Sequence, residues 1–149
     1  MSLCATVQRN LSRSIDLYEE LASTLPEDSL TSKLPSLRSN TIGQQLWCVV
    51  GARESYARAI TAGKWIGFSC SLDAEGITRR ESVHEALMRS GALVLDTVAD
   101  LASFDDARNQ LVLDLLEHEV AHHGQLIRYF YGLQLPIPAG WKGRYALGD

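Results

Sequence analysis

The chain has 149 residues, of which 46% are hydrophobic and 21% are charged, and its 14 basic and 18 acidic side chains leave a net charge of −4. This length suits a single domain, residues 1–149, whose core is large enough to fold without disulfide or metal staples. The lack of any run of Lys and Arg argues against a nucleic-acid partner, and no apolar stretch approaches the ~20 residues of a membrane span.

The apolar residues recur with a helical period, and no segment shows the alternation of a strand, so we expect an all-α protein. A first helix is predicted over residues 2–24, ending before Pro26. A second helix begins near Thr41, whose spacing to Gln44 fits a capping box, and ends near Gly63.

Residues 63–80 are rich in Gly, Ser and Trp and have no clear period. This segment is longer than the roughly 2–8 residues that join neighbouring antiparallel helices, so it predicts a crossover. A third helix is predicted over residues 80–102 and a fourth over residues 105–132. Four helices with one long connection between the second and the third predict a four-helix bundle, followed by a short irregular tail.

The cysteines and the N-terminal sequence indicate the cellular compartment in which the protein is expected. Cys4, Cys48 and Cys70 are an odd number at wide spacing, which is typical of a reducing compartment and not of a disulfide framework. The N-terminus shows no basic stretch followed by an apolar one, as a signal peptide would. We therefore expect a cytoplasmic protein with no membrane partner.

The fourth predicted helix carries two histidines on its core stripe. At about 100° per residue, His118 and His122 fall on one line with Leu115 and Leu126. Side chains four residues apart stack one turn above the other and can point at one ion, which makes such pairs common metal ligands. The alternative is a buried histidine hydrogen-bonded to a carbonyl or a Tyr. The spacing of the pair and its position on the core face favour metal binding.

The second predicted helix has an uncharged polar face around Cys48. This face is too polar for a close-packed core and is typical of a cavity wall. A free cysteine is most often a small buried hydrophobe, so Cys48 by itself does not indicate a ligand. The residues on this side are Thr41, Gln44, Gln45, Ala52, Ser55, Tyr56 and Ala59.

Residues 118–122 also spell H-E-x-x-H, the zinc-protease signature in which the glutamate, here Glu119, acts as general base. The extended signature needs a third histidine at position 128, which is Arg128. The chain also has no predicted strands to form the sheet beside which such helices bind substrate. These departures argue against a zinc protease.

Two segments resemble the DinB-like metal-binding bundles. In the first, residues 116–126, an H-x-x-x-H pair is followed by one residue and then Gly-Gln, with a Pro-containing tail at residues 133–136. In the second, residues 41–54, the chain begins Thr-Ile-Gly, where family members show a small residue, Ile and Gly, then Leu and a His. The helix order resembles the family over most of the chain, whereas the specific motifs are confined to these two segments.

The resemblance implies a metal site open to a cavity, with one histidine from the second helix and two from the fourth. His118 and His122 match, but Cys48 stands in place of the second-helix histidine. A thiolate ligates zinc at about 2.3 Å, so the three residues would form a triad with water in the fourth place. The thiolate would weaken the pull of the ion on that water. The metal is zinc, nickel or another divalent ion, and the alternative is a site that has lost its metal.

Further polar residues of the second and fourth helices are candidates for roles around these ligands. Gln44, Ser55 and Tyr56 on the second helix, and Glu119 and His123 on the fourth, are candidates for lining the cavity or supporting the ligands. Glu119 and His123 lie about a quarter-turn or more from the ligand line, where a subunit contact is the simpler interpretation.

The fourth helix and the tail give indications of a second subunit and of a substrate. This helix is apolar around most of its circumference, which predicts burial on two sides and hence a homodimer. The tail either packs on the bundle or covers the cavity mouth and meets an anionic substrate. Its candidate residues for either role are Trp141, Lys142, Arg144 and Tyr145.

By the same resemblance, the metal would hold the sulfur of a low-molecular-weight thiol as a thiolate that attacks an electrophilic carbon of a second small-molecule substrate. The expected function is that of a metal-binding protein acting as a thiol S-transferase or isomerase. The alternatives are a metal-dependent hydrolase and a non-catalytic bundle dimer without metal. Since a fold does not transmit chemistry, metal binding without an assigned activity ranks first.

Overall fold

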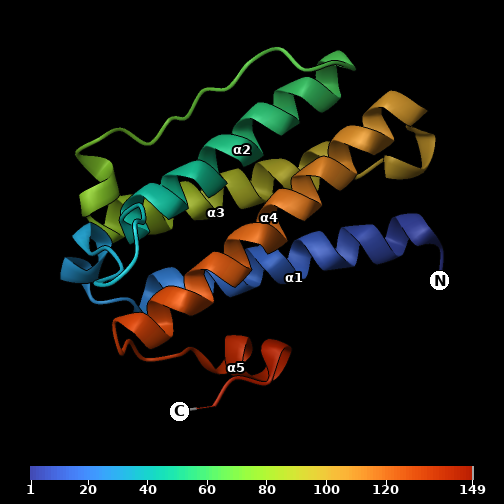
Figure 1. Ribbon diagram of the computed structural model, residues 1–149. Helices are drawn as coiled ribbons and strands as arrows, with labels where there is room; N and C mark the ends of the chain where they lie inside the picture. The colour runs from blue at the N-terminus through green and yellow to red at the C-terminus, as the bar shows by residue number, and fades with distance from the viewer. Residues whose placement is uncertain (149) are drawn as a thin grey trace.

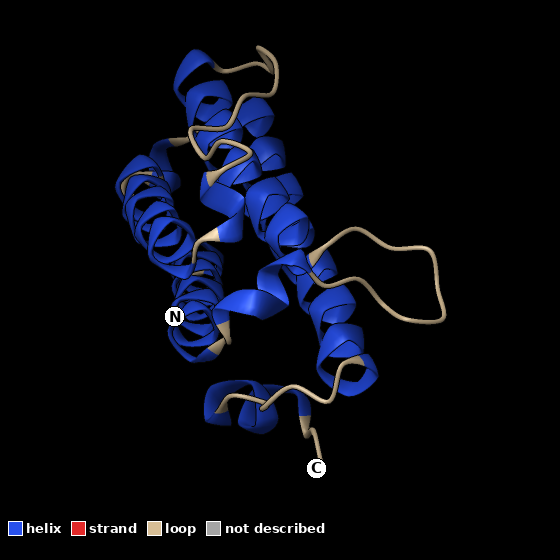
Figure 2. Cartoon of the chain, turned by 90° about the vertical axis from the view of Figure 1, so that its left-hand side faces the viewer, coloured by secondary structure: helices blue, strands red, loops and turns tan. Residues whose placement is uncertain are grey.

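The computed structural model describes residues 1–148, and every regular element within them is a helix. The long helices lie side by side (Figure 1), and Figure 2 shows no strand in this part of the chain. The prediction of an all-α protein is therefore confirmed. The long helices are α1 (Leu3–Thr24), α2 (Ile42–Ala62), α3 (Arg80–Thr97) and α4 (Asp106–Gly132).

Capping groups that the sequence contains set the ends of these helices. The Thr41 hydroxyl accepts a hydrogen bond from the Gln44 amide at 3.1 Å, and Gln44 Oε1 accepts one from the Thr41 amide at 2.9 Å. These two bonds form the predicted capping box at the start of α2. Gly63 ends α2 at a φ of +78°, a left-handed conformation that glycine adopts without strain. Asp105 caps α4 by accepting a hydrogen bond from the Arg108 amide.

The segment between α2 and α3 returns along α2, so that these two helices run in the same direction (Figure 1). The Trp65 ring lies against Tyr56 with ring centroids 5.1 Å apart, and the Phe68 ring lies against Trp47 at 5.2 Å. Gly51 makes room for this segment, because a Cβ atom there would overlap the Phe68 ring. A single 3₁₀ turn, η2 (Gly76–Thr78), precedes α3.

The core forms where the long helices face one another. Helix α2 packs against α3 and α4, and α1 packs against the same two helices. Tyr18, Leu46 and Leu126 belong to one buried cluster, and Leu11 and Leu115 belong to a second. A 3₁₀ turn, η1 (Glu27–Thr31), follows α1. None of the helices within residues 1–148 is both long and apolar enough to cross a bilayer.

Two elements differ from the sequence-based expectation. Helix α3 ends at Thr97, several residues early, and a 3₁₀ turn, η3 (Leu101–Ser103), follows it. The tail, expected to be irregular, contains a short helix, α5 (Ala139–Tyr145). Seven residues are too few for an apolar period to show, and isolated helices of this length are unstable. Tertiary packing stabilises α5: Trp141 is fully buried and its indole N–H donates to the Leu17 carbonyl at 2.8 Å.

Candidate metal centre

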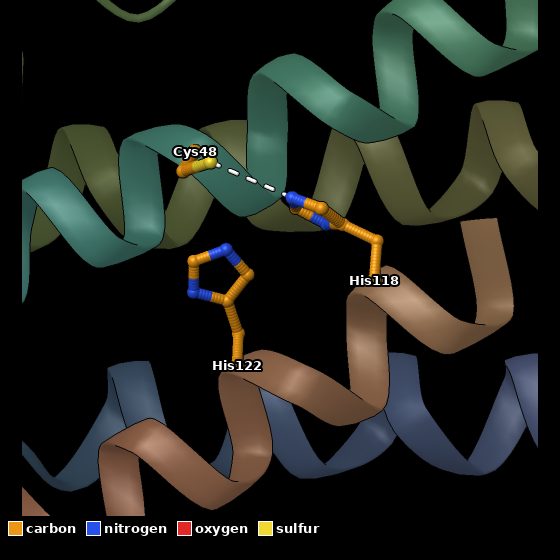
Figure 3. A group of neighbouring side chains, drawn as sticks. All are labelled: Cys48, His118 and His122. Atoms are coloured by element: carbon orange, nitrogen blue, oxygen red, sulfur yellow. Dashed lines mark hydrogen bonds between the residues drawn. The ribbon is translucent and has the colours of Figure 1, made fainter. Parts of the chain in front are cut away.

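Cys48 on α2 and His118 and His122 on α4 point toward one another (Figure 3). One potential ligand atom of each lies within 4.8 Å of those of the other two. Cys48 Sγ is 3.5 Å from His118 Nε2, and the two imidazole centroids are 4.6 Å apart. The spacing of four residues stacks the two histidines on one helix face, and the packing of α2 on α4 brings the thiol opposite them. These three donors could hold a metal ion.

Gln45 determines which nitrogen of His122 carries the hydrogen. Gln45 Oε1 is 2.6 Å from His122 Nδ1. A carbonyl oxygen can only accept, so Nδ1 donates and Nε2 keeps its lone pair. Figure 3 shows the Nε2 edge of the ring on the side of Cys48 and His118. Metal-binding histidines usually donate their second ring N–H to such a partner, so His122 is arranged as a ligand would be.

His118 has a buried ring nitrogen that lacks a partner within residues 1–148. Its Nε2 faces the thiol of Cys48, while its Nδ1 makes no hydrogen bond. Buried polar groups are nearly always paired, and exceptions mark strain, catalysis or a place for a water or an ion. His118 would ligate an ion through Nε2, which faces the thiol, and its unpaired Nδ1 is a place for a water molecule. The fit to a metal therefore rests on the three donor atoms themselves.

Burial controls the protonation of all three donors. Burial lowers the pKa of His118, and burial together with the neighbouring His118 lowers the pKa of His122 to about 4. Both imidazoles are thus neutral at physiological pH, the form that ligates metals. Burial raises the pKa of the Cys48 thiol. Metal binding would therefore require Cys48 to lose a proton, whereas the histidines have none to lose.

Two cavities lie near the triad. One, of about 530 Å³, is lined by Cys48, by Asp73 and by apolar side chains including Trp47 and Ile77. The other, of about 500 Å³, is lined by polar side chains including Arg128 and Gln45, the partner of His122. Asn40 lines both cavities. The first reaches the triad directly at Cys48, and the second reaches Gln45, the hydrogen-bond partner of His122.

The other predicted residues of α2 divide between the cavity and the crossover. Gln44 lines the same cavity as Cys48, as the polar face of the helix predicted. The Ser55 hydroxyl accepts from the Ser69 amide at 3.0 Å and donates to the Ser69 carbonyl at 3.1 Å. Tyr56 lies against Trp65. Ser55 and Tyr56 thus hold the segment between α2 and α3 against α2, and these contacts lie away from the three donors.

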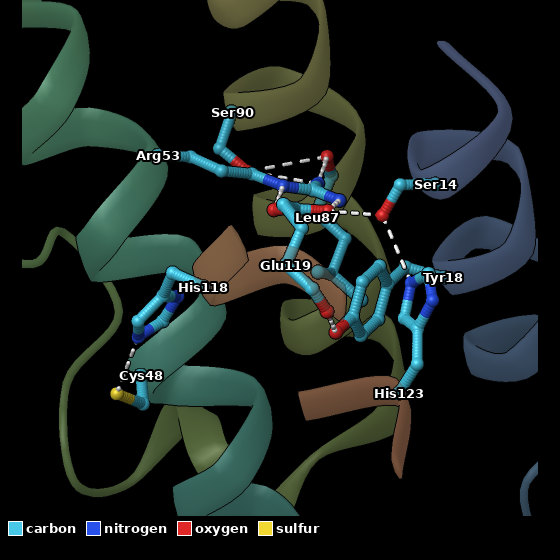
Figure 4. A network of polar contacts seen from close by, with 9 residues as sticks. All are labelled: Ser14, Tyr18, Cys48, Arg53, Leu87, Ser90, His118, Glu119 and His123. Carbon is cyan, nitrogen blue, oxygen red and sulfur yellow. Dashed lines mark hydrogen bonds and ion pairs between the residues drawn. The ribbon is translucent and has the colours of Figure 1, made fainter. Parts of the chain in front are cut away.

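Glu119 is enclosed within the chain and paired with Arg53 (Figure 4). Arg53 Nε and Nη2 lie 2.6 and 3.0 Å from the two carboxylate oxygens, and the side chains are 0% and 2% exposed. Ser14 Oγ donates a further bond at 2.5 Å. Burial by itself would raise the pKa of Glu119, but Arg53 and Ser14 outweigh it and hold that pKa below its usual value. Glu119 therefore offers no surface to a second subunit.

His123 lies on the other side of α4 from His118 (Figure 4). Its Nε2 is 2.9 Å from Ser14 Oγ and its Nδ1 is 2.6 Å from the Tyr145 hydroxyl. Because Ser14 donates its hydrogen to Glu119, Nε2 must donate to Ser14, and Nδ1 then accepts from Tyr145. The tail thus packs against α4 through Tyr145 and against α1 through Trp141, and none of its described residues, up to Gly148, lines the cavity beside Cys48.

Neither Gln45 nor Arg53 was predicted as a site residue from the sequence. Gln45 was visible in the polar face around Cys48, three residues or nearly one turn away, which was a usable signal. Arg53 is a charged residue in a helix face that is otherwise buried, and a buried charge predicts a buried partner. Nothing in the sequence named that partner as Glu119, which lies on another helix.

Comparisons of this chain with protein-family models, with curated proteins and with solved structures find no significant match. No relative therefore supplies a ligand set, a substrate or a reaction. Function must therefore be inferred from the three converging donors, from their hydrogen-bond partners and from the two nearby cavities.

Proposed function

We propose that the protein is a DinB-like four-helix bundle that binds one divalent metal ion through Cys48, His118 and His122. The observation that carries the proposal is the convergence of three donor atoms within 4.8 Å. The Gln45 contact supports it, since it leaves the lone pair of His122 Nε2 free. Two imidazoles and a thiolate suit zinc, with a fourth position open to a small molecule, and nickel also accepts imidazole ligands.

Metal analysis tests this proposal. Protein purified without chelator and without nickel-affinity chromatography is expected to carry close to one divalent ion per chain. The double variant His118→Ala/His122→Ala is expected to carry none, because one remaining donor does not hold an ion. The matched control is His84→Ala, since His84 lies on α3 outside the cluster and is partly exposed. Wild-type protein that is isolated metal-free and cannot be reloaded would show that there is no site.

The affinity for zinc is expected to rise about tenfold per pH unit between about pH 7 and pH 8, because one proton leaves for each ion bound. Burial raises the pKa of Cys48, so the thiol is protonated throughout this range, while the lowered pKa values of His118 and His122 leave both rings neutral. Competition titrations with a chelator of known affinity measure the slope.

The variant Cys48→His provides the comparison for this slope. It keeps three donors but replaces the thiol by a group that releases no proton above its own pKa, so the pH dependence is expected to flatten. A wild-type affinity that does not change with pH would place Cys48 outside the ligand set.

We propose further that the site activates a small thiol for transfer to an electrophilic carbon, or for isomerisation of that substrate. A bound divalent ion would favour the thiolate form of the thiol. In the transfer reaction, the thiol proton is released, a C–S bond forms, and the leaving group departs with its bonding electrons. The cavity with Trp47 and Ile77 suits an apolar reactant, and the cavity with Arg38 and Arg128 suits an anionic one. Metal-assisted hydrolysis is the second candidate.

A spectroscopic experiment separates these reactions. The cobalt-substituted protein is expected to change its visible absorption when cysteamine is added, because sulfur would enter the coordination sphere. Ethanolamine, which differs only in carrying oxygen for sulfur, is expected to leave the spectrum unchanged. If none of a range of small thiols changes the visible absorption, the hydrolase or a non-catalytic protein would be favoured.

A further inference from the structure

A small polar pocket lies where α1, α4 and the end of α5 meet, apart from the three metal donors. Its volume is about 90 Å³, and its lining includes Asn10, Arg13 and Ser14 from α1 and Arg144 and Tyr145 from α5. A water molecule occupies about 30 Å³ in the liquid, so the pocket has room for a group of only a few heavy atoms. A compact polar ligand fits this space better than an extended one.

Buried hydrogen bonds hold the inner wall of the pocket in place. Ser14 and His123 are each 2% exposed, and they are bonded to each other, to Glu119 and to Tyr145. The Ser14 hydroxyl donates its hydrogen to Glu119, and the Tyr145 hydroxyl donates its hydrogen to His123 Nδ1, so neither hydrogen is available to a ligand. The inner wall is therefore preformed, and the donors available to a ligand are those of the rim.

Two arginines give the rim its charge. Within residues 1–148, neither Arg13 nor Arg144 forms an ion pair with a carboxylate, and the Arg144 guanidinium lies 5.4 Å from the Tyr145 ring centroid. Burial raises the pKa of Tyr145 while the charges of both arginines act to lower it, so both charges reach this hydroxyl. Glu119, the carboxylate behind the inner wall, is neutralised by Arg53. The pocket therefore attracts anions.

We propose that this pocket binds a small oxyanion, with the chemistry of a phosphate group, between Arg13 and Arg144. Guanidinium groups present planar pairs of N–H donors that match the oxygens of such an anion, and the Asn10 amide can supply a further donor. The anion would offset the repulsion between the two arginines and join α5 to α1. None of the three metal donors lines this pocket, so the proposal does not depend on the metal.

A phosphate titration of the full chain at constant ionic strength tests the proposal. Inorganic phosphate is expected to produce saturable amide chemical-shift changes at residues 10–14 and 144–145. Arg13→Gln and Arg144→Gln are each expected to weaken binding by about tenfold or more, since each removes a charge-assisted contact. Both side chains are exposed, so the variants should fold. Arg9→Gln, an exposed arginine on the same helix outside the pocket, should bind like the wild type.

Three results would overturn the proposal: shifts that do not saturate, shifts centred on another part of the chain, or an equal loss in the Arg9→Gln variant. Glycerol phosphate forms a second arm of the experiment. If it binds as well as inorganic phosphate, the pocket holds the phosphate group of a larger molecule. If only inorganic phosphate binds, the small volume restricts the pocket to the free ion. Either of these outcomes supports the oxyanion site, and the two together distinguish a free phosphate ion from the phosphate group of a larger molecule.

Discussion

Acidification of the metal-free protein from about pH 7 toward pH 4 is expected to lower its free energy of unfolding by about 3 kcal/mol for each of His122 and His123. Burial is the main cause, since it lowers the pKa of both histidines to about 4. In the unfolded chain the pKa returns to its ordinary value of about 6.5. Between these two values the unfolded state binds protons that the folded state does not, so stability falls as pH falls.

Denaturant unfolding at a series of pH values measures this dependence. The variant His123→Gln is expected to remove the contribution of His123, about 3 kcal/mol, because glutamine can hydrogen-bond to Ser14 and Tyr145 but does not titrate in this range. The variant His84→Gln is the control, since His84 is partly exposed and lies outside the buried network. Unfolding free energies that stay constant over this range would contradict the burial of neutral histidines.

The variant Glu119→Gln is expected to lose about 3–5 kcal/mol of stability, because it leaves the buried Arg53 charge without its partner. Arg53 is completely buried, and within residues 1–148 its remaining acceptors are the Leu87 carbonyl and the Ser90 hydroxyl, both at Nη1. Glutamine preserves the shape of the side chain but not its charge. Denaturant titration at neutral pH measures the loss.

A matched surface variant and a double replacement give this experiment its controls. Glu85→Gln removes the carboxylate of an exposed ion pair with Arg89, and such pairs contribute about 1 kcal/mol or less. Replacing both buried partners, as in Arg53→Met/Glu119→Leu, is expected to cost much less than the sum of the single changes, because neither leaves an unpaired charge. If Glu119→Gln cost no more than Glu85→Gln, the buried pair would not stabilise the fold.

Local chemistry made most of the helix boundaries predictable. The capping box of Thr41 and Gln44 and the left-handed Gly63 act within a few residues, so their effect on α2 can be deduced without tertiary structure. The early end of α3 and the existence of α5 could not be deduced in this way. Helix α5 depends on the burial of Trp141 between distant parts of the chain, including the Leu17 carbonyl.

The candidate site was predictable to the extent that it lies on one helix. The spacing of His118 and His122 places them on one face, and the structure stacks their rings. Cys48 entered the prediction through the resemblance, and only the packing of α2 on α4 brings its sulfur to 3.5 Å from His118. The partner of His122, Gln45, likewise depends on that packing.

The sequence by itself determined the all-α class, the starts of the long helices and the stacking of two histidines, because periodicity and caps act over a few residues. Only the tertiary structure decided which helix each polar group on α4 meets. His118 and His122 face α2. Glu119 meets α2 through Arg53 and α1 through Ser14, and His123 meets Tyr145 of α5. The physical reason is that a buried polar group takes its partner from whichever helix packs against it, and sequence separation sets no limit on that choice.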